Sequence, residues 1–183
     1  ARSFKSLIRD MKNVEDNDYD VPKSLKGVLR GYQTRGFLWL KTLNACGFGG
    51  ILADDMGLGK TLQVIAFLLS SYQEGIYQKP TLIVCPASLI YNWESEIRRF
   101  APELKTRMIL GTAKEREEQI AGIDGGDVCI TSYDLLRRDM QAYENTKFAC
   151  QVIDEAQHIK NHSTKAAKAV KSIQAGFHLA LTG

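Results

Sequence analysis

No stretch of this sequence is apolar enough to cross a membrane, because no run approaches the roughly 20 residues that a bilayer requires. The amino terminus alternates charged with apolar residues and so lacks the apolar segment of a secretory signal peptide. The 183 residues include only 4 prolines, and 44% are hydrophobic, which excludes collagen-like and disordered chains. We therefore expect a soluble chain that folds as one globular domain with a packed core.

Cysteine pairs at the spacing of a zinc site or a redox motif are also missing. The four cysteines are isolated from one another in the sequence: Cys46, Cys85, Cys129 and Cys150. Three of them lie within apolar runs, so we expect buried thiols in a reducing cytosol. His158 and His162 are four residues apart and could share a helix face, but no third ligand is near them. We interpret them as surface histidines rather than as a zinc site.

The chain has no strong excess of one charge, with 24 Lys and Arg against 21 Asp and Glu and a formal net charge of +3. That balance permits an acidic partner but does not indicate one. Any nucleic-acid function must therefore be argued from motifs.

The beginning of the chain differs in character from the rest. Residues 1–27 combine an amphipathic stretch with an acidic run that is rich in turn-forming residues. We expect an appended helix and linker there, followed by a folded domain over residues 28–183. From Leu29 onward, apolar residues recur at helical spacing and stop at Gly47, which has the residue type of a helix C-cap.

Beyond this helix, short apolar runs alternate with helix-length spacers. The runs are residues 50–53, 81–85, 106–110, 128–131, 149–153 and 179–182. Apolar runs without polar alternation are typical of strands covered on both faces, and helix-length spacers suit right-handed crossovers between parallel strands. The sequence therefore predicts a three-layer, RecA-like α/β fold with a mainly parallel sheet and helices on both faces.

Two of the spacers predict helices with different surroundings. Residues 60–73 are apolar on nearly all sides, so we expect a deeply packed helix. Residues 88–100 carry one apolar stripe that includes Trp93 and Ile97, with charges opposite. This pattern predicts a helix that lies on the sheet with one face in solvent.

The first chemical motif is a glycine-bearing loop, ADDMGLGKT, between the apolar run at 50–53 and the helix at 60–73. Glycines let successive main-chain N–H groups surround phosphate oxygens, and the helix amino terminus adds the positive end of its dipole. Lys60 would then reach the β- and γ-phosphates, and the Thr61 hydroxyl would bind Mg²⁺. The predicted nucleotide-binding residues of this loop are Asp55, Met56, Gly57, Leu58, Gly59, Lys60 and Thr61. Asp54 replaces the first glycine of the strict P-loop pattern, so the prediction rests on the strand–loop–helix context.

A second motif places two adjacent carboxylates, Asp154 and Glu155, directly after an apolar strand. A carboxylate at the carboxyl end of a strand beside the phosphate loop can hold Mg²⁺ through its water shell, which we assign to Asp154. Its neighbour Glu155 can orient or deprotonate the attacking water. Such a pair alone is usually a solvated turn, and its combination with the phosphate loop favours the catalytic interpretation.

Six segments resemble, in their order, the motifs of one family: LRGYQ, ADDMGLGKT, LIVCPASLIYNW, ITSYDLL, VIDEAQHIKN and LALTG. Residues 28–183 resemble the first RecA-like lobe of Swi/Snf-type DNA translocases, within helicase superfamily two. The resemblance implies a DNA-dependent ATP hydrolase that tracks along duplex DNA to displace or remodel bound proteins. The DEAQ box and the short motif spacing resemble bacterial members, which implies a cytoplasmic, nucleoid-associated protein; a eukaryotic member would be nuclear.

The resemblance assigns roles to two glutamines. Gln33 would read the adenine edge with an amide that both donates and accepts hydrogen bonds, whereas a glutamine on a helix face is otherwise merely solvated. Gln157 matches a position, histidine in many relatives, that couples the nucleotide site to the DNA-bound surface and completes the predicted catalytic set. Gly31 stands where many relatives have proline, which weakens the expected helix start but leaves Gln33 in place.

The resemblance also implies contacts to the DNA backbone at two strand ends. The matching residues are Pro86, Ser88 and Asn92 after one strand, and Thr131, Ser132 and Tyr133 after another. Hydroxyl and amide groups at strand ends suit phosphate contacts that do not depend on sequence. For Ser88 and Ser132, a role as helix caps explains the residue type equally well.

Family members continue into a second RecA-like lobe whose arginines complete the ATP site, whereas this sequence stops at Gly183. We therefore expect a truncated motor, a lobe that binds ATP but hydrolyses it slowly by itself. Three alternatives stay open at this point. They are a strand-separating or RNA helicase of the same superfamily, a nucleotide-sensing module without turnover, and a metabolic P-loop enzyme.

Overall fold

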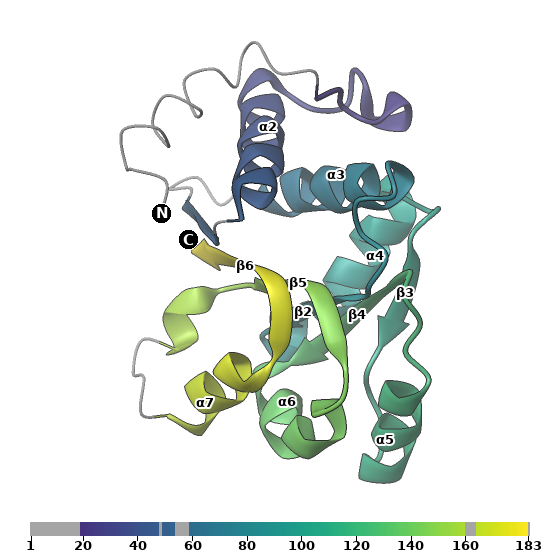
Figure 1. Cartoon of the computed structure of the whole chain (residues 1–183), viewed down its shortest axis with the longest axis vertical. Coiled ribbons are helices and arrows are strands. Elements are labelled where there is room, and N and C mark those ends of the chain that lie inside the picture. The colour runs from purple at the N-terminus through teal and green to yellow at the C-terminus, as the bar shows by residue number, and fades with distance from the viewer. Residues whose placement is uncertain (1–18, 48, 54–58, 160–163, 183) are drawn as a thin grey trace.

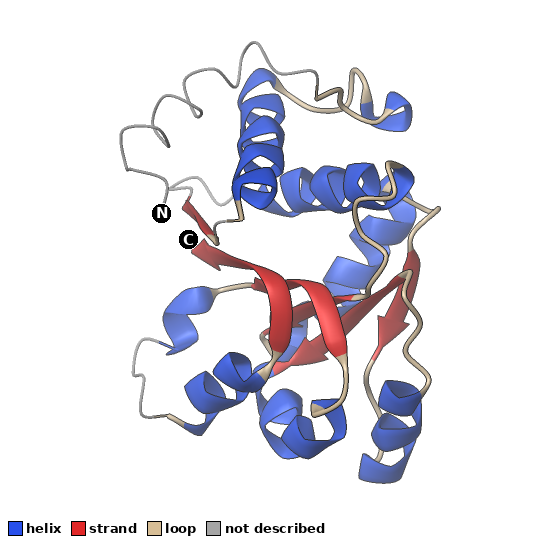
Figure 2. Cartoon of the chain, viewed as in Figure 1, coloured by secondary structure: helices blue, strands red, loops and turns tan. Residues whose placement is uncertain are grey.

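The structure, a computed structural model, describes residues 19–47, 49–53, 59–159 and 164–182. Six strands form one sheet in the order β1-β6-β5-β2-β4-β3, and every neighbouring pair runs parallel (Figure 1, Figure 2). The strands are β1 (Gly50–Ala53), β2 (Thr81–Cys85), β3 (Lys105–Met108), β4 (Asp127–Ser132), β5 (Lys147–Ile153) and β6 (Gln174–Thr182). The predicted α/β fold with a parallel sheet is confirmed.

Helices cover both faces of this sheet (Figure 1). Helices α3 and α4 lie over one face, with α2 packed against α3, while α5, α6 and α7 lie over the other. Their bounds are α2 (Gly31–Cys46), α3 (Lys60–Gln73), α4 (Ile90–Phe100), α5 (Ala113–Ala121), α6 (Tyr133–Asp139) and α7 (Lys165–Ser172). The three predicted layers are therefore present.

Strand residues alternate between two cores, one on each face of the sheet. On β2, Ile83 and Cys85 belong to the core beneath α3 and α4, and Leu82 and Val84 belong to the core beneath α6 and α7. Successive side chains of a strand point to opposite faces, so a strand covered on both faces must be apolar at every position. Strand β2 is accordingly buried along its whole length.

Helix α3 is packed on all sides, as its apolar sequence predicts, since every residue from Gln63 to Ser71 is buried. Helix α2 approaches it closely at Gly36, where a Cβ atom would lie 1.8 Å from the Gln63 Oε1 atom. A larger residue at position 36 would push the Gln63 side chain aside. The glycine thus permits the close approach of α2 to the helix that follows the predicted phosphate loop.

Helix α2 begins at Gly31 because a capping arrangement compensates for the weak helix propensity of glycine. The Arg30 main-chain N–H donates a hydrogen bond of 2.8 Å to the Gln33 Oε1 atom. The helix ends at the predicted residue, since Gly47 has a φ of 76°. Glycine adopts this left-handed conformation without the steric cost of a side chain.

Strand β6 is longer than predicted, since it begins at Gln174 and not at residue 179. Its first residues alternate between exposed and buried, and they pair with the beginning of β5 from Lys147 onward. An unbroken apolar run marks only the part of a strand that is covered on both faces. The half-open beginning of β6 carries no such signal.

The chain before residue 28 also contributes to the core. Leu25, at the end of the 3-10 helix η2 (Lys23–Leu25), is 1% exposed and belongs to the same core cluster as the buried residues of α2 and α3. The predicted appended helix falls within residues 1–18, which lie outside the described residues. The domain boundary at residue 28 therefore stays a prediction.

The predicted burial of three cysteines is confirmed, since Cys85, Cys129 and Cys150 are fully buried thiols. Burial raises the pKa of each to about 12, which keeps them protonated and unreactive in the folded protein. Within the described ranges, no three metal-binding side chains cluster; the His158 side chain and the whole of His162 are not among the described parts of the chain. No helix in the same ranges combines the length and the apolarity of a membrane span.

Candidate functional site

The candidate site lies at the edge of the sheet where the carboxyl ends of the parallel strands meet. Strand β1 leads toward Lys60, the first residue of α3, while β6 ends at Thr182 and β5 leads directly to Asp154. The Lys60 Nζ atom donates a hydrogen bond to the Thr182 carbonyl oxygen, and the lysine side chain is buried. The strand order β1-β6-β5 thus brings together two motifs that are far apart in the sequence.

The amino terminus of α3 offers main-chain donors to an anion. Its N-cap is Gly59, which has a φ of 90° and supplies no side-chain cap to the N–H groups of the first turn. Those N–H groups and the positive end of the dipole of this 14-residue helix suit a phosphate group. Of the predicted loop, Gly59, Lys60 and Thr61 are described, whereas Asp55, Met56, Gly57 and Leu58 lie outside the described residues.

Gln33 lies directly against the end of this loop. A Cβ atom on Gly59 would be 2.1 Å from the Gln33 Nε2 atom and 3.2 Å from the Tyr32 hydroxyl. Gln33 is 6% exposed, so its interpretation as a merely solvated glutamine is wrong. Its amide oxygen caps its own helix while its amide nitrogen faces the loop. The role of Gln33 in reading adenine stays a prediction.

Asp154 is held by three hydrogen bonds from different parts of the chain. The Trp93 indole Nε1 donates to Asp154 Oδ2 at 2.8 Å, and the Glu155 main-chain N–H donates to Asp154 Oδ1 at 2.9 Å. The Tyr133 hydroxyl donates to the Asp154 carbonyl oxygen at 2.6 Å. Burial raises the pKa of the Asp154 carboxyl, although the two donors and the positive charge of Lys60 act in the opposite direction.

Glu155 has an unusual main-chain conformation. Its φ of 53° makes it the one non-glycine residue with a left-handed backbone in the part of the chain that the structure describes. Its carboxylate accepts a hydrogen bond from the Gln157 amide nitrogen, and the buried Gln157 Oε1 has no partner among the described residues. Strain of this kind is typical of functional positions. The structure thus links Asp154, Glu155 and Gln157 by hydrogen bonds after β5, and their catalytic roles stay predictions.

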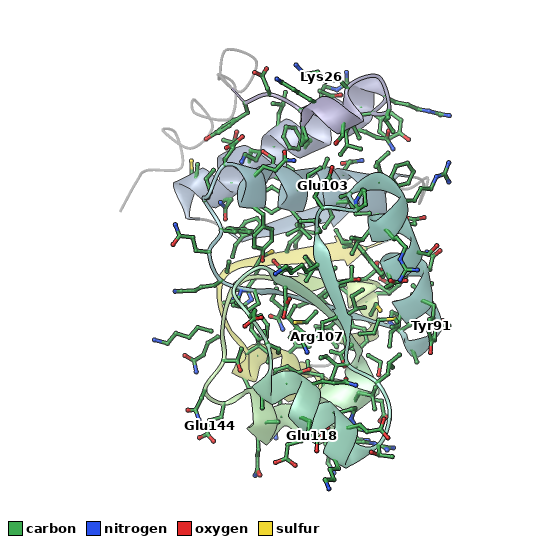
Figure 3. All side chains as sticks on the ribbon, turned by 90° about the vertical axis from the view of Figure 1, so that its right-hand side faces the viewer. Lys26, Tyr91, Glu103, Arg107, Glu118 and Glu144 are labelled. Carbon is green, nitrogen blue, oxygen red and sulfur yellow. The ribbon has the colours of Figure 1, made fainter. Side chains whose placement is uncertain are left out.

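The first predicted DNA-contacting segment follows β2 and presents polar groups to solvent. Pro86 is half-buried, whereas Ser88 and Asn92 are exposed. Ser88 does not cap a helix, because the N-cap of α4 is Leu89 without a side-chain hydrogen bond. Figure 3 shows the neighbouring Tyr91, which is 66% exposed, pointing outward from the same helix.

The second predicted segment, at the end of β4 and the start of α6, is turned inward. Thr131 is fully buried, and its hydroxyl has no hydrogen-bond partner in the described parts of the chain. Ser132 is an N-cap, since its Oγ accepts a hydrogen bond from the Leu135 N–H at 3.2 Å. Tyr133 is directed toward Asp154. The cap interpretation holds for Ser132, and contacts of these three residues with DNA stay predictions.

A surface hollow joins the two segments. It has a volume of about 310 Å³ and is lined by Pro86, Ala87, Ser132, Tyr133, Asp134 and Ala166. Three of the six predicted DNA-contacting residues therefore meet at one place, although their motifs are well separated in the sequence.

The contact between Trp93 and Asp154 was not predicted from the sequence. Trp93 belongs to the apolar stripe of α4 and is 1% exposed, which agrees with a plain core residue. A buried indole N–H nevertheless needs an acceptor. A tryptophan on the apolar stripe of a helix therefore signals a buried hydrogen bond, but the sequence does not identify the acceptor.

Comparisons with known proteins agree with this geometry. A family model described as the SNF2-related domain matches residues 32–183. Over 178 residues the chain is 42% identical to an uncharacterized ATP-dependent helicase of Mycoplasma pneumoniae, covering 96% of this chain and 17% of that protein. Over 185 residues it is 38% identical to a Bacillus subtilis protein named as an ATP-dependent helicase/translocase, YwqA, covering 100% of this chain and 20% of that protein.

A solved structure, the SWI2/SNF2 ATPase core of Sulfolobus solfataricus in complex with dsDNA, has the same fold, with a TM-score of 0.76 and 40% identity. The match covers 91% of this chain and 33% of that core. The chain thus spans about a fifth of the length of the curated relatives and a third of the solved core. Because the family model covers most of the chain and the solved core shares its fold, the chain belongs to the SNF2-related family, as a RecA-like ATPase lobe.

Proposed function

We propose that this lobe binds ATP with Mg²⁺ and works in a motor that hydrolyses ATP in response to duplex DNA. The motor moves along the duplex and displaces or remodels DNA-bound proteins. One observation carries the proposal: Lys60, the uncapped amino terminus of α3 and Asp154 converge at the same edge of the sheet. The relatives named as helicases and a translocase, and the related core solved with dsDNA, support it.

The residues at this edge fit a nucleotide with a divalent cation. Lys60 and the first N–H groups of α3 supply positive charge and donors for phosphate oxygens. The Thr61 hydroxyl and the Asp154 carboxylate supply the oxygen ligands that Mg²⁺ prefers, in part through its water shell. When bound, ATP with Mg²⁺ supplies an activated phosphoryl group whose charge the cation partly neutralises.

Within this proposal, Glu155 is the residue that receives a proton. Its carboxylate orients a water molecule and accepts a proton from it as the water attacks, and the Gln157 amide keeps the carboxylate in place. Gln33 contacts the adenine edge from the other side of the loop. Arginines of a second lobe complete the site across a cleft, so the lobe by itself binds ATP without rapid turnover.

The nucleotide assignment is tested by titrating a fluorescent ATP analogue into the wild type and into Lys60→Ala. Affinity should fall at least tenfold, since a hydrogen bond to a charged group contributes about 1.5–3 kcal/mol. Lys168→Ala is the matched control, because Lys168 is exposed on α7 on the opposite face of the sheet. Equal affinities for wild type and Lys60→Ala would overturn the assignment.

The DNA assignment is tested with the same chain and a short duplex over a range of salt concentrations. A lobe with a net charge of +3 neutralises few phosphates, so it should bind DNA weakly and without sequence preference. The affinity should fall only gently as the salt concentration rises. Asn92→Ala should weaken binding, while Gln141→Ala, at an exposed position in η4 (Met140–Tyr143), should not. Tight sequence-specific binding, or none at very low salt, would contradict the assignment.

A further inference from the structure

Two aromatic side chains from separate segments donate hydrogen bonds to the same residue, Asp154. Trp93 reaches its carboxylate from α4, and Tyr133 reaches its main-chain carbonyl from the start of α6. The two donors are neutral, so they fix the orientation of the aspartate without cancelling its charge. Carboxylates that bind metal ions are commonly held in this way by neighbouring hydrogen bonds.

Each of these aromatic residues directly follows a residue that is predicted to contact DNA. Asn92 is exposed at the surface of α4, while Trp93, the next residue, is buried against Asp154. Ser132 and Tyr133 both line the hollow between the two segments, and Tyr133 also binds Asp154. A shift of either segment at the surface must therefore move a donor at the aspartate.

We propose that Trp93 and Tyr133 are positioning residues that orient Asp154 for Mg²⁺ and connect it to the two predicted DNA-contacting segments. The inference rests on the proposed function, because it needs Asp154 to bind the cation. Trp93 orients the carboxylate of Asp154, and Tyr133 holds the main chain of Asp154 in position through its carbonyl oxygen. Duplex DNA on both segments would hold the two donors in place and thereby increase the affinity of the site for the cation.

The chain offers matched controls for both residues. Trp39, on α2, is the other of the two tryptophans in the chain, and its indole N–H has no hydrogen-bond partner in the described parts of the chain. Tyr77 is 7% exposed, and its hydroxyl donates to Asn44 Oδ1 at 2.8 Å, away from Asp154. Trp39→Phe and Tyr77→Phe thus remove the same groups without touching the site.

The first measurement is the Mg²⁺ concentration at which a fluorescent ATP analogue reaches half of its Mg²⁺-dependent binding. Trp93→Phe should raise this concentration about tenfold, and Tyr133→Phe should raise it less, with Mg²⁺-free nucleotide binding unchanged in both. Trp39→Phe and Tyr77→Phe should match the wild type. Thermal melting identifies any variant that fails to fold; Tyr133→Phe then decides the outcome, since it removes a single hydroxyl.

The second measurement uses fluorescence instead of binding. In Trp39→Phe, Trp93 is the only indole left, so its emission reports directly on Asp154. Mg²⁺ with nucleotide should change that emission, and added duplex DNA should lower the Mg²⁺ concentration required. Tyr133→Phe in the same background should reduce this effect of DNA at least twofold.

The outcomes separate this inference from the proposed function. If Lys60→Ala weakens nucleotide binding but Trp93→Phe and Tyr133→Phe behave like their controls, the positioning role is overturned and the nucleotide site stands. If the wild type shows no Mg²⁺-dependent binding of the ATP analogue at all, the proposed function itself is overturned. An unchanged effect of DNA in Tyr133→Phe would overturn the connection between the DNA-contacting segments and Asp154.

Discussion

Two acidic residues, Asp139 and Asp154, are held by the fold in opposite ways. Asp139, at the end of α6, is 8% exposed and forms two hydrogen bonds with the Arg116 guanidinium, at 2.8 and 3.0 Å. Asp154, after β5, receives hydrogen bonds from the Trp93 indole and from a main-chain N–H, and it forms no ion pair within the described residues. The charge of Asp139 is neutralised inside the protein by Arg116, whereas the carboxylate of Asp154 is oriented by hydrogen bonds without being neutralised.

The charge of Asp139 supports the fold, whereas we propose that the charge of Asp154 serves the candidate site. A bidentate pair satisfies both oxygen atoms and links α5 to α6, so the fold depends on it. At Asp154, burial without a tight cationic partner raises the pKa, and the next residue, Glu155, has a left-handed backbone. Both features cost folding free energy. We therefore expect substitutions at the pair to lower stability, and substitutions at the site to lower activity while stability holds or rises.

The largest effect is expected for Glu155→Gln in a protein that carries this lobe together with its second lobe. A neutral amide cannot accept the proton of the attacking water, so ATP hydrolysis should fall by about 10²–10⁴. Nucleotide affinity should stay within about twofold, because in the proposed site Lys60 and the amino terminus of α3, rather than Glu155, would hold the phosphates. Phosphate release with and without duplex DNA checks this, with Glu118→Gln on exposed α5 as the control. Substantial DNA-stimulated hydrolysis by Glu155→Gln would remove Glu155 from catalysis.

The next largest effect is expected for the ion pair between Arg116 and Asp139. Arg116→Met leaves Asp139 without its cation and should lower the free energy of unfolding by about 3 kcal/mol. The value lies at the low end for such a pair because Asp139 also lines a surface hollow that water can enter. Urea unfolding measures it. Arg137→Met, which breaks an exposed pair with Asp134, should cause no measurable change, and equal losses in the two variants would contradict the distinction.

A smaller effect of opposite sign is expected for Glu155→Gly. Glycine removes the steric cost of a left-handed backbone, but its greater freedom in the unfolded chain offsets part of the gain. The net gain in unfolding free energy should be about 0.5–1 kcal/mol, with hydrolysis lost. Glu144→Gly is the matched control: Glu144 has a φ of −53°, so the same change should lower stability there. A loss of stability in both variants would show that the left-handed backbone of Glu155 does not cost stability that glycine can restore.

The sheet could be predicted from the sequence, and the candidate site residues could be proposed from it, for physical reasons that the structure makes clear. Strands covered on both faces must be apolar throughout, as β2 is, so their runs stand out in the sequence. Lys60 and Asp154 are predictable as candidate site residues because phosphate and cation chemistry restricts both residue type and position relative to a strand end, and the structure places both at the same sheet edge. Gly47 was found as a C-cap for the same kind of local reason.

The sequence could not predict the contacts that depend on where helices cross the sheet. Trp93 and Asp154 are 61 residues apart, and Arg116 and Asp139 are 23 apart. Neither pair shows a local pattern, because each contact follows from the packing of whole elements. The left-handed backbone of Glu155 was missed as well, since it goes against the intrinsic preference of that residue.

The smallest effect is the pH dependence of stability at Asp154. Because burial raises the pKa of this carboxyl in the folded protein, the folded state keeps a proton that the unfolded chain releases above the ordinary value of 3.8. The contribution of Asp154 to stability is therefore present below that value and is lost as pH rises through the raised pKa. The Asn side chain in Asp154→Asn does not titrate. The variant should therefore gain stability relative to wild type as pH rises from the ordinary value of 3.8 through the raised pKa of Asp154.

Urea unfolding of both proteins at a series of pH values from 3.5 to about 8 measures this difference. In the variant, either Trp93 or the Glu155 N–H faces an amide NH₂, which adds an offset to the free energy of unfolding. That offset is constant with pH, so only the change in the difference between the two proteins tests the prediction. The difference should shift in favour of Asp154→Asn as pH rises and then level off, because only one proton is involved. A shift in favour of wild type would mean that Asp154, like Asp139, is a carboxylate that the fold stabilises in its charged form, and the contrast between the two would fail.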